Sequence, residues 1–131
     1  MRLLLDTHTF IWLIDGSPRI SVAANASLVD PANELFFNIA SVWEMAIKIN
    51  RKKLSLSLGL DAFVIQGITA YGIKLLRLTV EDCVEYVTLP FPLQQHRDPF
   101  DRMIIVHAQR HGLTVVGTDP NFDAYGVTRL W

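Results

Sequence analysis

Five acidic residues occupy positions from which their carboxylates could act together: they are Asp6, Glu44, Asp98, Asp101 and Asp119. Asp6 directly follows the apolar run at 2–5, and Asp119 ends the short segment after the apolar run at 113–116. The other three acids lie in the first turns of segments with helical spacing. In an open parallel sheet, ligands bind beyond the carboxyl ends of the strands. We therefore expect the five side chains to converge at one edge of a sheet.

Converging carboxylates require a compensating charge. Two of them about 4 Å apart repel by roughly 4 kcal/mol at an effective dielectric constant of 20. Raised pKa values, basic neighbours or a bound cation could offset this repulsion. Oxygen ligands without a Cys/His cluster suit hard ions such as Mg²⁺ or Mn²⁺. Such an ion can activate water for attack on phosphorus and stabilise the leaving oxygen, so the acids indicate phosphodiester hydrolysis.

Helix capping is the alternative explanation for some of these acids. Asp98 before Pro99 is typical of a helix start, with Asp101 at the third helical position, and Ser41 and Glu44 have the spacing of a capping box. The two acids at strand ends fit this explanation less well. The recurrence at separate strand ends favours a shared site.

The elements that would position these acids alternate along the chain. Apolar and β-branched runs predict strands at 2–5, 34–39, 73–76 and 113–116 and a final short run at 127–131. Helical spacing predicts helices at 7–14, 21–29, 60–70, 79–88 and 99–111, and one from Ser41 to the basic cluster at 51–53. This order predicts an α/β domain with a mainly parallel sheet covered on both faces.

Composition narrows the class of protein. The 131 residues predict one domain, and 50% hydrophobic and 19% charged residues can form a sizeable core. Twelve Lys and Arg against 13 Asp and Glu leave a net charge of −1, so any phosphate-binding surface must be local. Cys83 is the only cysteine, which excludes an internal disulfide and a multi-cysteine zinc site and favours a reducing cytoplasm. No apolar run reaches the roughly 18 residues of a membrane span, so we expect a soluble protein with no membrane partner.

Four segments carry a resemblance to a known family. In chain order they are LLLDTHTFIW, SVWEMAIK, HRDPFDRMII and TVVGTD. Together they resemble a PIN-domain ribonuclease, and more narrowly the VapC-type toxins of type II toxin-antitoxin modules. The combination of D-T-H, W-E, R-D-P-F-D-R and T-x-D makes the resemblance specific, and it spans nearly the whole chain.

The resemblance implies a fold, an activity and partners. It implies a single PIN-like domain over residues 1–131, an α/β/α sandwich, and a divalent-metal-dependent endoribonuclease that uses Mg²⁺ or Mn²⁺. It also implies an RNA substrate, a cognate antitoxin, and self-association as a homodimer or a higher toxin-antitoxin assembly. The family's acidic site matches Asp6, Glu44, Asp98 and Asp119. Asp101 ranks below Asp98 as a metal ligand, Asp123 is weaker still, and Thr118 would supply a hydroxyl near the last acid.

Several other side chains have two interpretations. Lys48, Arg97 and Arg102 lie in the same segments as the acids, so they either contact RNA phosphates or form salt bridges with those acids. His107 and His111 have the i, i+4 spacing of a metal clamp, but without a third ligand, surface or capping roles are favoured. Trp12 and Trp43 are expected in the core, with an antitoxin-binding role as the alternative.

Other classes of protein are disfavoured by single positions. A receiver domain needs a paired acid after its first strand, where this chain has Thr7 and His8, and an aspartyl phosphatase needs D-x-D where this chain has D-T-H-T. The remaining rival is a non-catalytic PIN-like module that binds RNA or protein. Metal-dependent turnover distinguishes the two.

Overall fold

The computed structural model describes residues 1–131 and contains one five-stranded sheet in which every strand pair is parallel. The strands are β1 (Arg2–Leu5), β2 (Glu34–Asn38), β3 (Lys74–Leu76), β4 (Thr114–Val116) and β5 (Arg129–Leu130). Their order is β3-β2-β1-β4-β5, with Leu4 opposite Phe36 of β2 and Leu5 opposite Val116 of β4. The carboxyl ends of β1, β2 and β4 therefore lie side by side.

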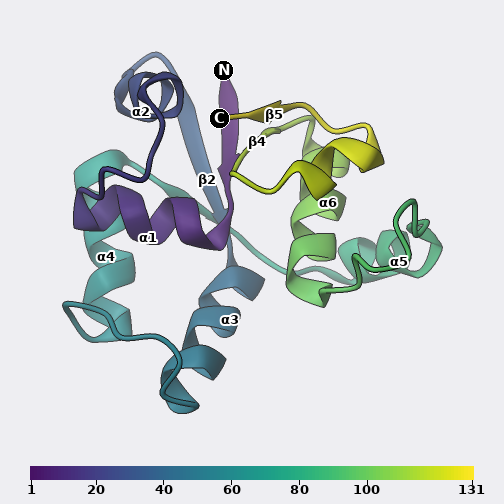
Figure 1. The fold of residues 1–131 in the computed structure, drawn as a ribbon, viewed down its shortest axis with the longest axis horizontal. Helices are drawn as coiled ribbons and strands as arrows, with labels where there is room; N and C mark the ends of the chain where they lie inside the picture. The colour runs from purple at the N-terminus through teal and green to yellow at the C-terminus, as the bar shows by residue number, and fades with distance from the viewer.

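Helices cover both faces of this sheet (Figure 1). They are α1 (Thr7–Asp15), α2 (Val22–Val29), α3 (Ile39–Asn50), α4 (Leu60–Tyr71), α5 (Val80–Thr88) and α6 (Pro99–His111), followed by the 3-10 helix η1 (Pro120–Tyr125). In Figure 1, α1, α2 and α4 lie on one side of the strands, and α5 and α6 lie on the other. The predicted α/β/α sandwich is thus confirmed, with a sheet that is wholly parallel.

The core consists of two clusters, one on each face of the sheet. Successive strand residues point to opposite faces, so Leu3 and Leu5 of β1 belong to one cluster and Leu4 to the other. In the first cluster the rings of Phe10 and Phe37 stack with their centroids 3.9 Å apart. Strands buried on both faces read as continuous apolar runs, which explains why they could be recognised in the sequence.

The start of α3 differs from the prediction. The helix begins at Ile39 and not at Ser41, because the Asn38 Oδ1 accepts a hydrogen bond of 2.6 Å from the backbone N–H of Ser41 and so caps the helix. Strand β2 accordingly ends at Asn38, one residue earlier than expected. The proposed capping box is therefore wrong, and Glu44 is not explained as a capping residue.

The last part of the chain is more ordered than expected. Residues 120–125, predicted as part of a loop, form η1, and the final strand β5 covers only Arg129–Leu130.

None of the helices combines the length and apolar character that crossing a bilayer requires.

Candidate active site

A cleft of about 320 Å³ opens at the carboxyl edge of the sheet. It is lined by Asp6, Thr7, His8, Glu44, Lys48, Asp98, Asp101, Thr118, Asp119 and Phe122. All five acids singled out in the sequence line this cleft, together with Thr118 and Lys48. They come from the ends of β1 and β4, from α3 and from the first turn of α6, as the parallel topology requires.

Asp6 both caps a helix and lines the cleft. It follows β1 directly, its Oδ1 accepts a hydrogen bond of 2.7 Å from the backbone N–H of Thr9, and its own N–H donates to the Val116 carbonyl of β4 at 3.1 Å. Burial raises the pKa of the Asp6 carboxyl above its ordinary value. Capping and a role in the cleft are thus compatible.

Glu44 is buried and fixed on both of its carboxylate oxygens. The Thr7 hydroxyl donates to Oε1 at 2.5 Å, and the Lys48 ammonium lies 3.2 Å from Oε2, one turn further along α3. Lys48 is the only lysine or arginine that lines the cleft. The site therefore has one cation among five carboxyl groups.

Asp98 and Asp101 enter the cleft from the start of α6. The Asp98 Oδ1 accepts hydrogen bonds from the backbone N–H groups of Phe100 at 2.8 Å and Asp101 at 3.1 Å, which makes Asp98 the helix cap. Burial raises the pKa of Asp101 to about 7, and repulsion from the other four carboxylates adds to this increase. The raised pKa of Asp101 therefore reflects its burial first and the convergence of the other carboxylates second.

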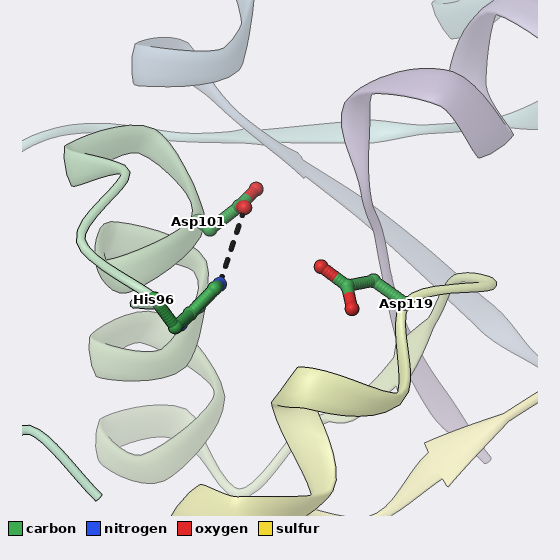
Figure 2. A group of neighbouring side chains, drawn as sticks. All are labelled: His96, Asp101 and Asp119. Carbon is green, nitrogen blue, oxygen red and sulfur yellow. Dashed lines mark hydrogen bonds and ion pairs between the residues drawn. The ribbon is translucent and has the colours of Figure 1, made fainter. Parts of the chain in front are cut away.

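Asp119 faces Asp101 across the cleft, as Figure 2 shows. It follows β4, and its Oδ1 accepts a hydrogen bond of 2.9 Å from the backbone N–H of Asn121 at the start of η1. One ligand atom each from His96, Asp101 and Asp119 lies within 4.8 Å of the others. The donor set around the cleft consists mainly of carboxylate oxygens, which suit Mg²⁺ or Mn²⁺.

Two polar residues of the site were not assigned to it from the sequence. Thr7 holds Glu44, and His96 is 5% exposed, with Nδ1 2.8 Å from the Tyr125 hydroxyl and Nε2 3.3 Å from the Asp101 Oδ2. Thr7 could have been noticed as a hydroxyl beside Asp6. The position of His96 two residues before Asp98 was a weak signal, because its partner Tyr125 is remote in sequence.

Arg102 is a correction to the sequence prediction. Its side chain is 1% exposed, and its Nη1 and Nη2 donate hydrogen bonds of 2.8 Å to the carbonyls of Pro90 and Leu89. The guanidinium also lies 3.7 Å from the centre of the Phe91 ring. Arg102 is therefore neither a contact for RNA phosphates nor a salt-bridge partner of the acids, because it is buried against the loop after α5.

Two further candidates lie outside the cleft. The Arg97 Nε donates to the Gln94 carbonyl at 2.9 Å, and its guanidinium stacks on Phe91, so it forms no salt bridge with the acids. Asp123 is exposed and pairs with Arg129 through Oδ1 at 2.8 Å. Neither residue lines the cleft.

His107 and Trp43 also differ from expectation. His107 is fully buried, with Nε2 3.0 Å from the Asp82 Oδ2, so it joins α6 to α5 and is neither a surface nor a capping histidine. Trp43 is 62% exposed and packs edge-on against Phe100. Its helical position resembled a core position, but that side of α3 faces solvent.

The parallel α/β/α sandwich with an acid-lined cleft at its carboxyl edge defines the general class of protein. The family is shown by the sequence: the PIN domain model matches residues 3–127, and the chain belongs to the PIN domain family, whose members are generally nucleases. A search of curated proteins found no significant match.

Solved structures of similar fold support the same architecture. VapBC2 from Rickettsia felis, bound to a promoter DNA fragment, aligns over 99% of this chain and 98% of that chain with a TM-score of 0.70 and 16% identity. VapBC-1 from nontypeable Haemophilus influenzae aligns over 99% of this chain and 97% of that chain, with a TM-score of 0.68 and 19% identity. FitAcB from Neisseria gonorrhoeae aligns over 98% of this chain and 96% of that chain, with a TM-score of 0.61 and 19% identity. At these identities the likeness shows the fold.

Proposed function

We propose that the protein is a divalent-metal-dependent endoribonuclease that hydrolyses RNA phosphodiester bonds with Mg²⁺ or Mn²⁺. The observation that carries this proposal is the convergence of five carboxyl groups around one cleft that contains a single lysine. Membership of the PIN domain family supports hydrolysis of nucleic acid.

Asp6, Glu44, Asp98 and Asp119 would hold the divalent ions, with Asp101 as a further ligand ranked below them. When bound, such an ion supplies an activated water and neutralises charge on the phosphate. The protein keeps these acids in place through backbone hydrogen bonds: Asp6, Asp98 and Asp119 each accept from an N–H at a helix start. A carboxylate fixed in this way loses little freedom when it binds a cation.

Lys48 would contact a phosphate of the RNA. Its ammonium already pairs with Glu44, which places it inside the cleft and limits its motion. A carboxylate-rich cleft repels a polyanion, so RNA binding needs both this cation and the divalent ions. Thr118 lines the same cleft and would donate its hydroxyl to a phosphate or a water molecule beside Asp119.

We further propose that the protein is the toxin of a type II toxin-antitoxin module, with a cognate antitoxin and a second copy of itself as partners. The VapBC and FitAcB structures of similar fold support this proposal. Copurification with the product of a neighbouring small reading frame, and the mass of the purified chain in solution, test the two partners separately.

Cleavage of total RNA by the partner-free chain, with Mg²⁺, with Mn²⁺ and with EDTA, tests the activity. Asp98→Asn and Asp119→Asn are suitable variants because asparagine also caps helices well, so the fold is retained. We expect each variant to lose cleavage at least about 100-fold, or about 2.7 kcal/mol of transition-state stabilisation.

Asp123→Asn is the matched control, since Asp123 lies outside the cleft. It should cleave like the wild type. Intact RNA with the folded, partner-free wild type and either metal would contradict the proposal and favour a non-catalytic module that binds RNA or protein.

A further inference from the structure

We propose that His96 is a positioning residue, which a buried relay from Arg102 through Tyr125 fixes as a hydrogen-bond donor to Asp101. This inference rests on the proposed function only in giving Asp101 a metal ion to bind. The relay itself consists of contacts within the chain.

The direction of the relay follows from its first member. The Tyr125 hydroxyl lies 3.3 Å from the Arg102 Nη1 and 2.8 Å from the His96 Nδ1. A guanidinium only donates hydrogen bonds, so the tyrosine oxygen accepts from Arg102. The tyrosine proton then points to the His96 Nδ1, which is the acceptor within hydrogen-bond distance.

The second step assigns the proton of the histidine ring. A neutral imidazole has one N–H donor and one acceptor, so a ring that accepts at Nδ1 carries its hydrogen on Nε2. The His96 Nε2 faces the Asp101 Oδ2 at 3.3 Å (Figure 2). His96 therefore donates a hydrogen bond to Asp101.

Asp101 needs such a donor because its other neighbours repel it. Asp98, Glu44 and Asp119 all raise the energy of an ionised Asp101 carboxylate. The side chain of Asp101 forms no hydrogen bond other than the one to His96. Without His96, the carboxylate would be free to rotate away from Asp119.

The surroundings keep the relay rigid and dry. His96, Arg102 and Tyr125 are 5%, 1% and 8% exposed, and the rings of Phe122 and Tyr125 pack edge-on against His96. Arg102 has no carboxylate within ion-pair distance, which is a costly state for a buried charge. Its hydrogen bond to Tyr125 fixes the direction in which Tyr125 and then His96 donate their hydrogen bonds.

Mn²⁺ affinity and histidine ¹⁵N chemical shifts test the proposal on the full chain. His96→Leu removes the donor, and we expect Mn²⁺ binding to weaken about 10- to 100-fold, as for other residues that orient metal ligands. His96→Gln keeps an N–H near the Nε2 position and should restore much of this affinity. Tyr125→Phe should move the His96 ¹⁵N shifts away from the Nε2–H tautomer and weaken Mn²⁺ binding as well.

Tyr86→Phe is the matched control, because Tyr86 also contacts the Arg102 guanidinium but its hydroxyl takes no part in the relay. It should change neither the tautomer nor the Mn²⁺ affinity. A hydrogen on the His96 Nδ1 in the wild type would overturn the relay, and so would unchanged Mn²⁺ affinity in a folded His96→Leu variant. If the wild type binds no Mn²⁺, the proposed metal site fails, whereas the ¹⁵N shifts, measured without metal, still decide the relay.

Discussion

Thr7 and Glu44 are joined by a hydrogen bond of 2.5 Å between the threonine hydroxyl and Oε1. Both residues are buried, and the bond connects the first turn of α1 to the second turn of α3. Glu44 is therefore held from the residue that follows Asp6. Two acids of the cleft depend on the same short segment of chain.

Replacement of Thr7 tests whether this bond positions Glu44. Thr7→Val removes the hydroxyl at nearly constant volume, and we expect the free energy of unfolding to fall by about 1 kcal/mol. RNA cleavage should fall about 10-fold, because Glu44 loses one of its two fixing contacts. Thr7→Ser retains a hydroxyl and should restore most of the activity. Equal cleavage rates in the valine and serine variants would contradict a positioning role.

Gly117 is the second residue that places Asp6. A Cβ built on Gly117 would lie 2.9 Å from the Asp6 Cγ and would clash with the carboxyl group. Gly117→Ala should therefore displace Asp6, destabilise the protein by about 1 to 3 kcal/mol and reduce divalent-ion binding measured by calorimetry. Gly72→Ala is the control: its positive φ of 64° makes alanine costly, but it has open space and is remote from the cleft. It should lose stability while binding the metal normally.

The raised pKa of Asp101 predicts a pH dependence of stability. A pKa of about 7 means that the folded protein holds this proton more tightly than the unfolded chain. In EDTA, Asp101 therefore destabilises the fold progressively as the pH rises from the ordinary aspartate pKa to about 7. Asp101→Asn does not titrate, so its stability relative to the wild type should increase between about pH 5 and about pH 7 in urea unfolding.

The pH dependence has an internal control and a metal control. Arg129 lowers the pKa of Asp123, so the effect of Asp123→Asn on stability should be constant over the same pH range. Saturating Mg²⁺ should remove the advantage of Asp101→Asn, because a cation stabilises the ionised carboxylate. An advantage that is independent of pH in EDTA would disagree with the cluster of charges described above.

Asp82 predicts the opposite behaviour at acid pH. It is buried, accepts a hydrogen bond from the backbone of Thr79, and contacts His107 and Arg110 of α6, and these contacts hold the pKa of its carboxyl well below its ordinary value. Its stabilising effect is complete above the ordinary aspartate pKa and is lost only as the pH falls toward the lowered value.

Asp82→Asn should therefore lower the free energy of unfolding by about 3 kcal/mol at neutral pH, and by less as the pH falls below about 4. Denaturant unfolding at neutral pH and below about pH 4 measures this difference in the free energy of unfolding. Glu85→Gln, on the exposed side of α5, should have little effect. A loss of unfolding free energy that is equally large at acid pH would show that Asp82 stabilises the protein through its packing and not through its charge.

The architecture and the acids of the cleft could be predicted because both follow from local patterns. Strands buried on both faces are continuous apolar runs, and an acid directly after such a run lies at the carboxyl edge of a parallel sheet. Asp6 illustrates this logic. The start of α3 was misplaced by two residues because both Asn38 and Ser41 can cap a helix, and only the hydrogen bond shows which one does.

The orientation of Arg102 and the role of His96 could not be predicted, because their partners are remote in sequence. All residues of α6 from 102 to 108 are buried, so helical periodicity does not reveal which way Arg102 points. Its carbonyl partners belong to the loop after α5, and the partner of His96 is Tyr125, 29 residues further along. Such contacts exist only once the chain has folded.

The position of β1 in the middle of the sheet determines when the cleft can exist during synthesis. Strand β2 follows β1 in the chain and can pair with it as soon as it emerges from the ribosome. The other neighbour of β1 is β4, at residues 114–116, and the segments that carry Asp98 and Asp119 flank it in the chain. A nascent chain that ends after α3 therefore holds only Asp6 and Glu44 of the five acids, because Asp98, Asp101 and Asp119 follow α4, β3 and α5 in the chain. The complete cleft can form only once Asp119, which follows β4, has joined the earlier acids.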